Sequence, residues 1–354
     1  MHAVILAGGE GTRLRPLTLT CPKPIVPLLN IPFLRYQLAW LTQHGIREAV
    51  LACSYGVAEI RRLLGDGAAA GMSLRYAVEP SPLGTAGALR NSAEPGEALL
   101  VVLNGDVLTD VDLSAMIRRH QASGARATIY LTPVDDPTLY GLVETDPDGR
   151  ILKFLEKPSR EQVTVNTINA GVYILDGSLL ELIANDRVVS MEREFFPDLL
   201  ARRISFFGHV SRAYWLDIGS LEKYRRAQAD LLTGAVATEM RPAGTRRGSL
   251  WIGEESVISP QAQVTGPAVI GSRARLAAEC RVEPFTVLGD GTSLERGSHL
   301  TGAVLWRDVR VGPGARLSGC LIADGCRIGA DAEIGPGAVL GAGSVVPDGA
   351  RVSV

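Results

Sequence analysis

The first 232 residues alternate short apolar runs with longer segments in which apolar positions recur at helical spacing. A short run bounded by turn residues indicates a buried strand, whereas apolar positions three and four residues apart indicate a helix. The runs that predict strands lie at residues 3–7, 49–53, 74–78, 98–103 and 127–131. The segments that predict helices lie at residues 33–44, 57–64, 86–93, 113–122 and 221–232. This alternation predicts a mixed, mostly parallel sheet with helices on both faces.

A different period begins near residue 251, where an aliphatic residue recurs at every sixth position. The recurring positions are Ile252, Ile258, Val264, Ile270, Leu276, Val282, Leu288, Leu294, Leu300, Leu305, Val311, Leu317, Ile322, Ile328, Ile334, Leu340, Val346 and Val352. The fifth position of the hexad is almost always small, as at Ala274, Cys280 and Ala332. Aliphatic side chains at this spacing can fill the axis of a narrow solenoid. The pattern predicts a parallel β-helix and resembles the left-handed hexapeptide-repeat kind.

Two irregularities mark this repeat, because its register slips by one residue at Leu305 and again at Ile322. Both slips lie near Trp306, so we expect one irregular face of the solenoid there. Some hexapeptide solenoids transfer acyl groups, with a histidine and usually a loop between coils. His299 is the only histidine of the repeat and lies within an unbroken hexad. We therefore expect the repeat to be structural and to serve oligomer contacts or regulation.

The two periods divide the chain into three parts. Residues 1–232 are predicted to form a Rossmann-like α/β domain, residues 233–250 an irregular linker, and residues 251–354 a left-handed parallel β-helix of hexapeptide repeats. A chain of 354 residues is long enough for two domains, each with its own core.

Composition excludes several classes of protein. With 46% hydrophobic residues, 21% charged residues and a net charge of -2, the chain shows neither the signature of disorder nor a nucleic-acid-binding field. It has no secretory signal pattern and no apolar run of membrane-spanning length, so we expect a cytoplasmic protein without a membrane or nucleic-acid partner. The five cysteines form no CxxC pair, which disfavours a zinc site or a disulfide framework.

A glycine-rich loop after the first predicted strand is the strongest candidate for chemistry. It reads Leu6-Ala7-Gly8-Gly9-Glu10-Gly11-Thr12-Arg13-Leu14 and matches neither a GxGxxG fingerprint nor a P-loop. Glycines let backbone N–H groups approach an anion closely. Arg13 and Lys23 add two cations. Lysine is rare in this chain, and the other lysines are Lys153, Lys157 and Lys223. The loop therefore suits a polyphosphate.

Two aspartates follow predicted strands, Asp106 in Asn104-Gly105-Asp106 and Asp217 in Trp215-Leu216-Asp217. Ligands of open α/β sheets bind at the carboxyl ends of the strands. Mg²⁺ takes one or two carboxylates, with water and phosphate oxygens completing its shell. Asp106 and Asp217 are the predicted magnesium ligands, although a turn former and a helix N-cap are their alternative roles.

Eight short motifs occur in order along the chain: GGEGTRLRPLT, PKP, LGTAG, NGD, YG, EKP, NAGVY and WLDIG. Their order and spacing resemble those of the nucleotide-sugar pyrophosphorylases, the sugar-1-phosphate nucleotidyltransferases, over the whole chain. Within that family the sequence looks most like the mannose-1-phosphate guanylyltransferases, through INAGVYIL, MEREFFP and the β-helix.

The resemblance implies roles for individual residues. It implies nucleotide binding by Leu6, Ala7, Gly8, Gly9, Gly11, Thr12, Arg13, Glu79, Gly84 and Thr85. It implies sugar-phosphate binding by Tyr140, Gly141, Glu156, Lys157, Asn169 and Gly171, and magnesium binding by Asp106 and Asp217. Arg13, Lys23, Asp106, Lys157 and Asp217 would be catalytic, since two anionic reactants must be held together and neutralised.

Glu79 is the residue expected to read the base. An ionised glutamate only accepts hydrogen bonds, so it suits the adjacent N–H donors of guanine, whereas glutamine would suit uracil or thymine better. A solvated loop glutamate is the alternative. In the same segment, Gly84 permits close backbone approach and Thr85 could cap the following helix.

The leading expectation is an enzyme that joins GTP and mannose 1-phosphate into a nucleotide-sugar and pyrophosphate. The alternatives are a uridylyl- or thymidylyltransferase that uses UTP or dTTP with glucose 1-phosphate, and a non-catalytic regulatory subunit of the same fold. Its partners would be the two substrates and further copies of the chain in a homo-oligomer, a dimer or a tetramer.

Overall fold

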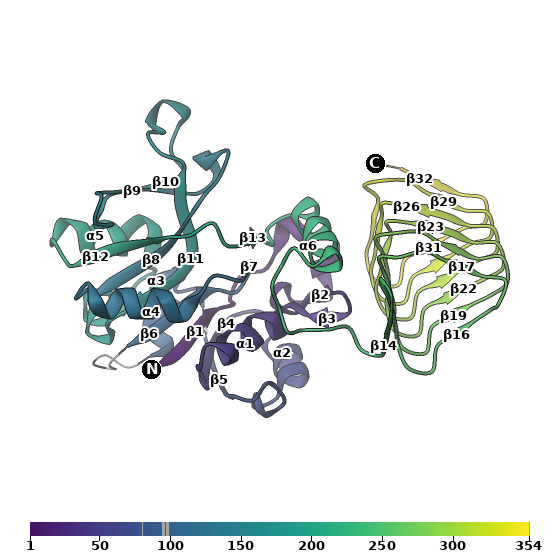
Figure 1. The fold of residues 1–354 in the computed structure, drawn as a ribbon, viewed down its shortest axis with the longest axis horizontal. Coiled ribbons are helices and arrows are strands. Elements are labelled where there is room, and N and C mark those ends of the chain that lie inside the picture. The colour runs from purple at the N-terminus through teal and green to yellow at the C-terminus, as the bar shows by residue number, and fades with distance from the viewer. Residues whose placement is uncertain (80, 94–95, 97–98, 354) are drawn as a thin grey trace. The chain divides into compact units, whose positions relative to one another are not determined.

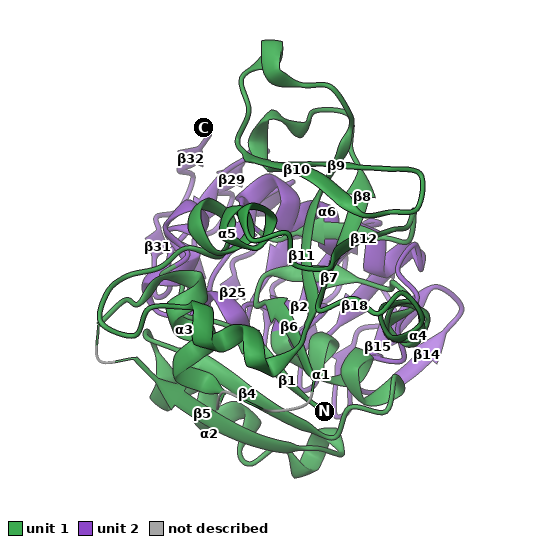
Figure 2. Cartoon of the chain, turned by 90° about the vertical axis from the view of Figure 1, so that its left-hand side faces the viewer, with its two compact units in different colours: residues 1–10, 34–218 green, residues 11–33, 219–354 purple. Residues whose placement is uncertain are grey.

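The computed structural model describes residues 1–79, 81–93, 96 and 99–353. The described chain forms two compact units, residues 1–10 with 34–218 and residues 11–33 with 219–354 (Figure 2). The chain therefore leaves the first unit just after its first strand and returns at residue 34. No described helix is long and apolar enough to cross a membrane.

The first unit is built on a mixed sheet with the strand order β10-β9-β11-β6-β1-β4-β5, with β8 on β11 and β12 on β8 (Figure 1). Its strands are β1 (His2–Leu6), β4 (Glu48–Cys53), β5 (Ser73–Val78), β6 (Leu100–Asn104), β8 (Ala127–Pro133), β9 (Gly141–Thr145), β10 (Ile151–Glu156), β11 (Thr167–Leu175) and β12 (Phe206–Val210). β1 pairs in parallel with β4 and β6, while β11 is antiparallel to β6 and β8. The predicted mixed, mostly parallel Rossmann-like sheet is confirmed.

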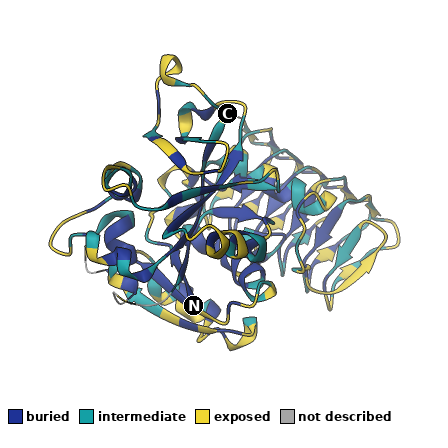
Figure 3. Ribbon diagram, turned by 60° about the vertical axis from the view of Figure 1, so that its left-hand side comes forward, coloured by how far each residue is buried: buried dark blue, intermediate teal, exposed yellow. Residues whose placement is uncertain are grey.

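Helices pack on this sheet and complete its core. They are α1 (Phe33–Gln43), α2 (Val57–Leu64), α3 (Gly84–Ser92), α4 (Leu113–Ala122) and α5 (Phe196–Ala201). Buried side chains such as Val4, Val102, Tyr173 and Phe196 form one cluster. Figure 3 shows the buried stretches of strands and helices in dark blue. Their apolar spacing explains why α1, α2 and α4 form where the sequence predicts helices.

Two departures from the sequence pattern shape the site. The segment Asn169-Ala170-Gly171 lies inside β11, a strand absent from the predicted runs, and the register with β8 shifts there between Asn169 and Tyr173. Residues 191–201 form a π-helical turn, Met191–Phe195, followed by α5. The apolar pattern of the sequence does not predict these short helices, because each spans less than two turns and gives little periodicity.

A small antiparallel pair in the first unit joins segments more than one hundred residues apart. β7 (Val107–Thr109) pairs with β13 (Trp215–Asp217), with Asp217 opposite Val107. The backbone N–H of Ile218 donates to the Asp106 carbonyl at 2.8 Å. The pairing therefore brings the chain at Asp106 and the chain at Asp217 side by side.

The second unit contains the left-handed parallel β-helix predicted from the hexads, described through residue 353. Each of its faces is a ladder of short strands. The first face holds β14 (Thr245–Arg247), β15 (Leu250–Ile252), β18 (Ala268–Ile270), β21 (Thr286–Leu288), β24 (Val304–Leu305), β27 (Leu321–Ile322) and β30 (Val339–Leu340). The second holds β16 (Val257–Ile258), β19 (Arg275–Leu276), β22 (Ser293–Leu294), β25 (Arg310–Val311), β28 (Arg327–Ile328) and β31 (Val345–Val346). The third holds β17 (Gln263–Val264), β20 (Arg281–Val282), β23 (His299–Thr301), β26 (Arg316–Ser318), β29 (Glu333–Ile334) and β32 (Arg351–Val352).

The two register slips lie at one corner of the solenoid rather than on a face. Leu288, Leu305 and Ile322 pair in succession, so the strands stay in register across both slips. The missing residue is taken from the corner that holds Gly302 and Gly319, both with positive φ, at 57° and 50°. Gly319 donates its N–H to the Thr301 carbonyl of the preceding coil at 2.9 Å. A shortened corner repeated in consecutive coils therefore replaces the irregular face that we expected.

The second unit also contains α6 (Leu221–Thr233) and residues 11–33, which include the short pair β2 (Pro27–Leu28) and β3 (Ile31–Pro32). The Tyr224 hydroxyl on α6 donates to the Pro27 carbonyl, and the Trp306 indole N–H donates to that hydroxyl at 2.9 Å. The Asn30 amide donates to the Leu288 carbonyl at 2.7 Å. Residues 11–33 are therefore hydrogen-bonded both to α6 and to the β-helix.

Candidate active site

The loop after β1 begins in the first unit, at Ala7, Gly8 and Gly9. Ser54 donates its hydroxyl to the Gly8 carbonyl at 2.6 Å. A Cβ on Gly8 would lie 3.0 Å from the Ser54 hydroxyl and 3.5 Å from Glu79 Oε1, whereas a Cβ on Gly9 would meet no described atom within 4 Å. The backbone is therefore tightly packed at Gly8 and open to a ligand at Gly9.

Glu79 follows β5 and lies beside this loop. Its side chain is buried, with 7% of the residue exposed, which excludes the solvated role that the sequence left open. Oε2 accepts a hydrogen bond from the Leu83 N–H at 3.1 Å, and Oε1 is the oxygen nearest to Gly8. One oxygen thus binds the backbone at Leu83, and the carboxylate is held next to the glycine loop.

Gly84 and Thr85 begin α3. Gly84 has φ 75°, and a Cβ there would lie 2.5 Å from the Val189 carbonyl oxygen, so only glycine fits. The Thr85 hydroxyl donates to Glu192 Oε2 at 3.0 Å and accepts from the Met191 N–H at 2.8 Å. Thr85, predicted to bind nucleotide, is therefore joined to the π-helical turn through its hydroxyl.

Glu192 is a charged residue of this region that the sequence analysis did not select. It belongs to the π-helical turn Met191–Phe195, a conformation that is rare and frequent at functional sites. Its Oε2 also accepts from the Ser190 hydroxyl at 2.9 Å. The MEREFFP motif was the available signal, but the sequence alone did not indicate which of its two glutamates points toward Thr85.

Glu156 and Gly141 face each other across the pair β9–β10. A Cβ on Gly141 would lie 3.0 Å from Glu156 Oε2. Burial, and then the negative charge of Glu192, raise the pKa of the Glu156 carboxyl, while the nearby cations Lys157 and Arg193 oppose the rise. Two predicted sugar-phosphate residues therefore lie together, next to the carboxylate of Glu192.

Lys157 has an unusual backbone conformation. Its φ is 50°, in the left-handed region, although the residue precedes Pro158, a position that favours extended conformations. Its N–H donates to the Tyr140 carbonyl at 2.9 Å, and its side chain is exposed. Such strain at a non-glycine residue is typical of functional sites.

Asn169 and Gly171 form the bulge within β11. The Asn169 side chain donates to the Tyr173 hydroxyl at 3.0 Å and accepts from the Gly171 N–H at 3.0 Å. Gly171 has φ 73°, and a Cβ there would lie 2.7 Å from the Asn104 side-chain nitrogen. The bulge thus brings the predicted sugar-phosphate residues against the end of β6, next to the segment that carries Asp106.

Asp106 and Asp217 are brought close by the β7–β13 pair. The Tyr140 hydroxyl donates to Asp217 Oδ1 at 3.1 Å, and the Tyr140 ring packs edge-on against Trp215, with centroids 5.4 Å apart. Among the described residues, no group of three or more His, Cys, Asp or Glu side chains could hold a metal by itself. A carboxylate pair without further protein ligands suits Mg²⁺, which keeps substrate and water oxygens in its shell.

The predicted cations of the loop lie in the second unit. Thr12, Arg13 and Leu14 form a 3₁₀ turn that begins after Gly11, whose φ is 67°. A Cβ on Gly11 would lie 2.8 Å from the Lys23 Cβ, so the glycine packs directly on the lysine stem. The Thr18 hydroxyl donates to the Gly11 carbonyl at 2.8 Å. The GTR and PKP motifs therefore meet, and Arg13 is exposed.

Taken together, the first unit gathers hard carboxylate oxygens, a strained lysine and glycines that permit close backbone approach. The second unit pairs a glycine turn bearing Arg13 with Lys23. Carboxylates for a divalent cation and cations for phosphate groups are what transfer between two phosphorylated reactants requires. The residue types of each unit therefore suit a phosphoryl-transfer enzyme of the nucleotidyltransferase class.

Comparison with known proteins is consistent with that class. Residues 2–234 match the family described as nucleotidyl transferase, and residues 264–354 match the domain described as the GMPPB C-terminal domain. The chain belongs to the nucleotidyl transferase family, and it is a sugar-1-phosphate nucleotidyltransferase. Nucleotidyltransferases of this family generally use divalent metal ions.

The sequence similarity to individual relatives covers most of the chain. It is 38% identical to the mannose-1-phosphate guanylyltransferase of Mycobacterium tuberculosis over 89% of this chain and 82% of the relative. It is 31% identical to the UTP–glucose-1-phosphate uridylyltransferase of Synechocystis over 91% of this chain and 87% of the relative. The crystal structure of HddC from Yersinia pseudotuberculosis complexed with GMP-PN is 30% identical, with a TM-score of 0.56, over 65% of this chain and 100% of that one.

Proposed function

We propose that this enzyme transfers GMP from GTP to mannose 1-phosphate, giving GDP-mannose and pyrophosphate. The support for the sugar is the name of the Mycobacterium tuberculosis relative and of the Arabidopsis thaliana relative, mannose-1-phosphate guanylyltransferase 1, which is 33% identical over 91% of this chain. Support for a guanine nucleotide also comes from the GMP-PN complex of HddC.

The observation that carries the choice of base is the buried Glu79 carboxylate beside Gly8. A carboxylate offers only acceptors, and the Watson–Crick edge of guanine presents two adjacent N–H donors. Uracil and thymine present an acceptor on each side of a single donor, so a carboxylate meets them poorly. Burial strengthens this discrimination, because an unpaired polar group away from water is costly.

The proposed reaction is an in-line displacement at the α-phosphorus of the triphosphate. A phosphate oxygen of the sugar 1-phosphate forms the new P–O bond, and the bond from the α-phosphorus to the α,β-bridging oxygen breaks. The electron pair leaves with pyrophosphate. The attacking oxygen is already ionised near neutral pH, so no side chain has to remove a proton.

The side chains then act by neutralising charge and orienting groups. Arg13 and Lys23 are proposed to bind the triphosphate and stabilise the departing pyrophosphate, and Lys157 to bind the attacking phosphate. Asp106 and Asp217 would hold Mg²⁺, with Tyr140 orienting Asp217 through its hydrogen bond. When bound, Mg²⁺ supplies charge neutralisation at the phosphate oxygens.

The sugar pocket is proposed to comprise Tyr140, Gly141, Glu156, Lys157, Asn169 and Gly171, with Glu192 as an addition. The carboxyls of Glu156 and Glu192 can accept hydrogen bonds from sugar hydroxyls, and the bulge at Gly171 lets a sugar approach the backbone. Leu6, Ala7, Gly8, Gly9, Gly11, Thr12, Gly84 and Thr85 are proposed to line the nucleotide.

A second candidate is a uridylyl- or thymidylyltransferase that acts on glucose 1-phosphate. The similarity to the Synechocystis uridylyltransferase favours it, as does a putative glucose-1-phosphate thymidylyltransferase structure from Bacillus anthracis, 25% identical with a TM-score of 0.59 over 65% of this chain and 94% of that one. A cytoplasmic location and a homo-oligomeric state remain predictions from the sequence.

The deciding experiment is a pyrophosphate-release assay that crosses GTP, ATP, UTP, CTP and dTTP with mannose, glucose and heptose 1-phosphates. We expect the highest kcat/KM with GTP and mannose 1-phosphate. In Glu79→Gln the preference for GTP over UTP and dTTP should fall by about 10-fold or more. Faster turnover of wild type with UTP or dTTP would favour the second candidate.

A further inference from the structure

We propose that Gln37 is a positioning residue that fixes the turn carrying Asp106; this inference rests on the proposed role of Asp106 as a metal ligand. Gln37 lies on α1 and is buried, with 3% of the residue exposed. The sequence alone indicates no role for it, because a single glutamine in an amphipathic helix carries no distinguishing signal.

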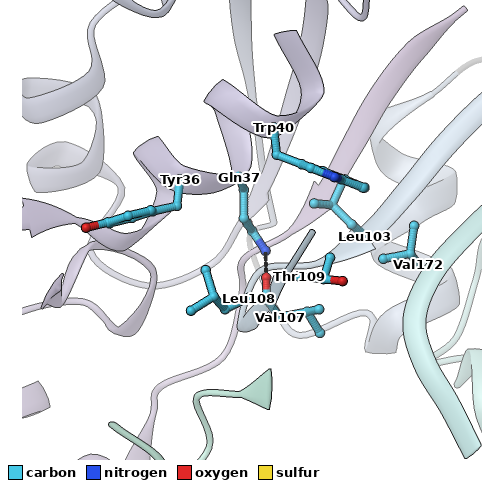
Figure 4. Close-up of a pocket in the computed structure, with 8 residues that line it drawn as sticks. All are labelled: Tyr36, Gln37, Trp40, Leu103, Val107, Leu108, Thr109 and Val172. Carbon is cyan, nitrogen blue, oxygen red and sulfur yellow. Dashed lines mark hydrogen bonds between the residues drawn. The ribbon is translucent and has the colours of Figure 1, made fainter. Parts of the chain in front are cut away.

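The amide of Gln37 bridges the two ends of the turn. Its Nε2 donates to the Asn104 carbonyl at 2.9 Å and to the Val107 carbonyl at 2.9 Å. These carbonyls flank Gly105 and Asp106, so one side chain holds both sides of the turn. Figure 4 shows the bond from the Gln37 amide to Val107. Both donors of the amide are used, and each carbonyl receives one.

Two backbone hydrogen bonds complete the support of this turn. The Gly105 N–H donates to the Leu6 carbonyl at 2.9 Å, and the Asp106 carbonyl accepts from Ile218. Gly105 also packs closely, since a Cβ there would lie 2.8 Å from the Leu6 carbonyl oxygen. Asp106 itself lies between β6 and β7, outside either strand. Gln37 thus supplies the side-chain support that the sheet does not give.

The surroundings of Gln37 indicate that the amide is present for this purpose. It borders a cavity of about 10 Å³ whose other lining residues are mostly apolar, among them Trp40, Leu103 and Val172. Its Oε1 is buried and has no hydrogen-bond partner among the described residues. An apolar side chain would avoid that cost. The two bonds to the turn are the contribution that an apolar side chain could not make.

Trp40 offers a matched control one turn along the same helix. Its indole N–H donates to the Val111 carbonyl at 3.0 Å, beyond β7 and five residues from Asp106. Like Gln37, Trp40 is buried and borders the same cavity. Trp40→Phe therefore removes a buried hydrogen bond to the same segment without touching the turn.

The test compares Gln37→Met, Gln37→Asn and Trp40→Phe with wild type and with Asp106→Asn. Two quantities are measured besides stability: Mn²⁺ binding by electron paramagnetic resonance in the presence of a non-hydrolysable GTP analogue, and the Mg²⁺ concentration that gives half-maximal kcat. We expect Gln37→Met to weaken Mn²⁺ binding and lower kcat by about 10-fold each, as removal of a residue that supports a metal ligand does. The KM for sugar 1-phosphate should stay within about twofold.

The controls separate positioning from stability. Trp40→Phe should lower Tm yet keep wild-type Mn²⁺ binding. Gln37→Asn, which keeps the amide but cannot span both carbonyls, should give an intermediate loss, and it provides the same comparison if Gln37→Met unfolds at the assay temperature.

Two results would refute the inference in different ways. If Asp106→Asn loses metal binding while both Gln37 variants keep it, the role of Gln37 is wrong and the proposed function stands. If Asp106→Asn itself keeps Mn²⁺ binding and turnover, the proposed metal site is wrong, and the role of Gln37 is refuted with it.

Discussion

At the scale of single residues, Glu156 and Lys157 are in environments that cost stability. Glu156 is a partly buried carboxyl beside the carboxylate of Glu192, and Lys157 has a left-handed backbone directly before a proline. Neither condition helps the chain to fold. Both residues were predicted to bind the sugar phosphate, and a cost in stability at a binding site is the usual relation between stability and activity.

Replacement of Lys157 tests its proposed contact with the attacking phosphate. Lys157→Ala should raise the KM for sugar 1-phosphate on the order of 10-fold, because a charge-assisted hydrogen bond is lost, with little change in the KM for triphosphate. Lys153→Ala is the control, since Lys153 lies on β10, the strand that ends just before Lys157, and pairs instead with Glu144 at 3.8 Å. Equal effects of the two variants in steady-state kinetics would refute a specific contact.

The raised pKa of Glu156 predicts a pH-dependent gain in stability on replacement. A carboxyl whose pKa is higher in the folded protein binds more protons there than in the unfolded chain, so its contribution to stability falls as pH rises from the unfolded pKa of 4.5 through the folded one. Glu156→Gln removes this penalty. We expect its Tm to exceed that of wild type at pH 8 and the difference to shrink as pH falls toward 4.5.

The measurement is a series of thermal unfolding curves from pH 4.5 to 8. Glu144→Gln, on the neighbouring strand β9, is the control because Glu144 pairs with Lys153. A Tm difference for Glu156→Gln that is the same at every pH would show that its ionisation is not the cause.

At the scale of elements, the link between α3 and the π-helical turn organises one side of the site. Thr85 bonds to both Met191 and Glu192, and the Ala86 N–H donates to the Val189 carbonyl at 3.0 Å. The first turn of α3 is therefore tied to residues 189–192 by side-chain and backbone hydrogen bonds. The LGTAG motif therefore connects α3 to the π-helical turn, in addition to being a candidate nucleotide-binding loop.

Removal of the Thr85 hydroxyl should weaken the connection between α3 and the π-helical turn and lower stability. Thr85→Val keeps the shape of the side chain but leaves the N–H of the buried Met191 without its acceptor, so the free energy of unfolding should fall by about 1–3 kcal/mol. Thr85→Ser, which retains the hydroxyl, should recover most of the loss. Denaturant titration of both variants provides the check, and equal stability of Val and Ser variants would contradict the assignment.

The sequence predicted the regular elements well and the irregular ones poorly. Helices such as α2 and α4 agree with their expected bounds because their apolar faces are long enough to define a period. The bulge at Asn169–Gly171 and the turn Met191–Phe195 depend on tertiary contacts, with Tyr173 and with Thr85. The same reason applies to Gln37 and Glu192, whose partners are distant in sequence.

At the scale of the whole molecule, the notable feature is that residues 11–33 belong to the unit of the β-helix. The predicted triphosphate residues Arg13 and Lys23 lie in this segment. Its anchors are hydrogen bonds between residues about two hundred or more positions apart, such as Tyr224 to Pro27 and Asn30 to Leu288. No local pattern in the sequence indicates such pairings, so only the structure reveals this organisation.

The β-helix should therefore influence nucleotide binding through its contact with α6. Trp306→Phe removes the indole N–H that donates to the Tyr224 hydroxyl, and that hydroxyl anchors Pro27. We expect the KM for triphosphate to rise roughly fivefold, the equivalent of one hydrogen bond, while the KM for sugar 1-phosphate is unchanged. Trp251→Phe, in β15 of the same solenoid, is the control.

Steady-state kinetics with each substrate varied in turn provides the check. A rise in both KM values for Trp306→Phe would indicate general destabilisation. No rise in either would show that the anchoring of residues 11–33 does not depend on Trp306.

The shortened corner at Gly302 and Gly319 bears on how this solenoid can evolve. One coil advances by 18 residues from Ile270 to Leu288 (288 − 270) and by 17 from Leu288 to Leu305 (305 − 288), yet all three positions remain paired. Each coil pairs only with the coils next to it. Loss or duplication of a complete coil therefore leaves the remaining strands in register, whereas deletion of one residue within a strand does not. Natural length variants of this chain should accordingly differ by whole coils, or by single residues at this corner.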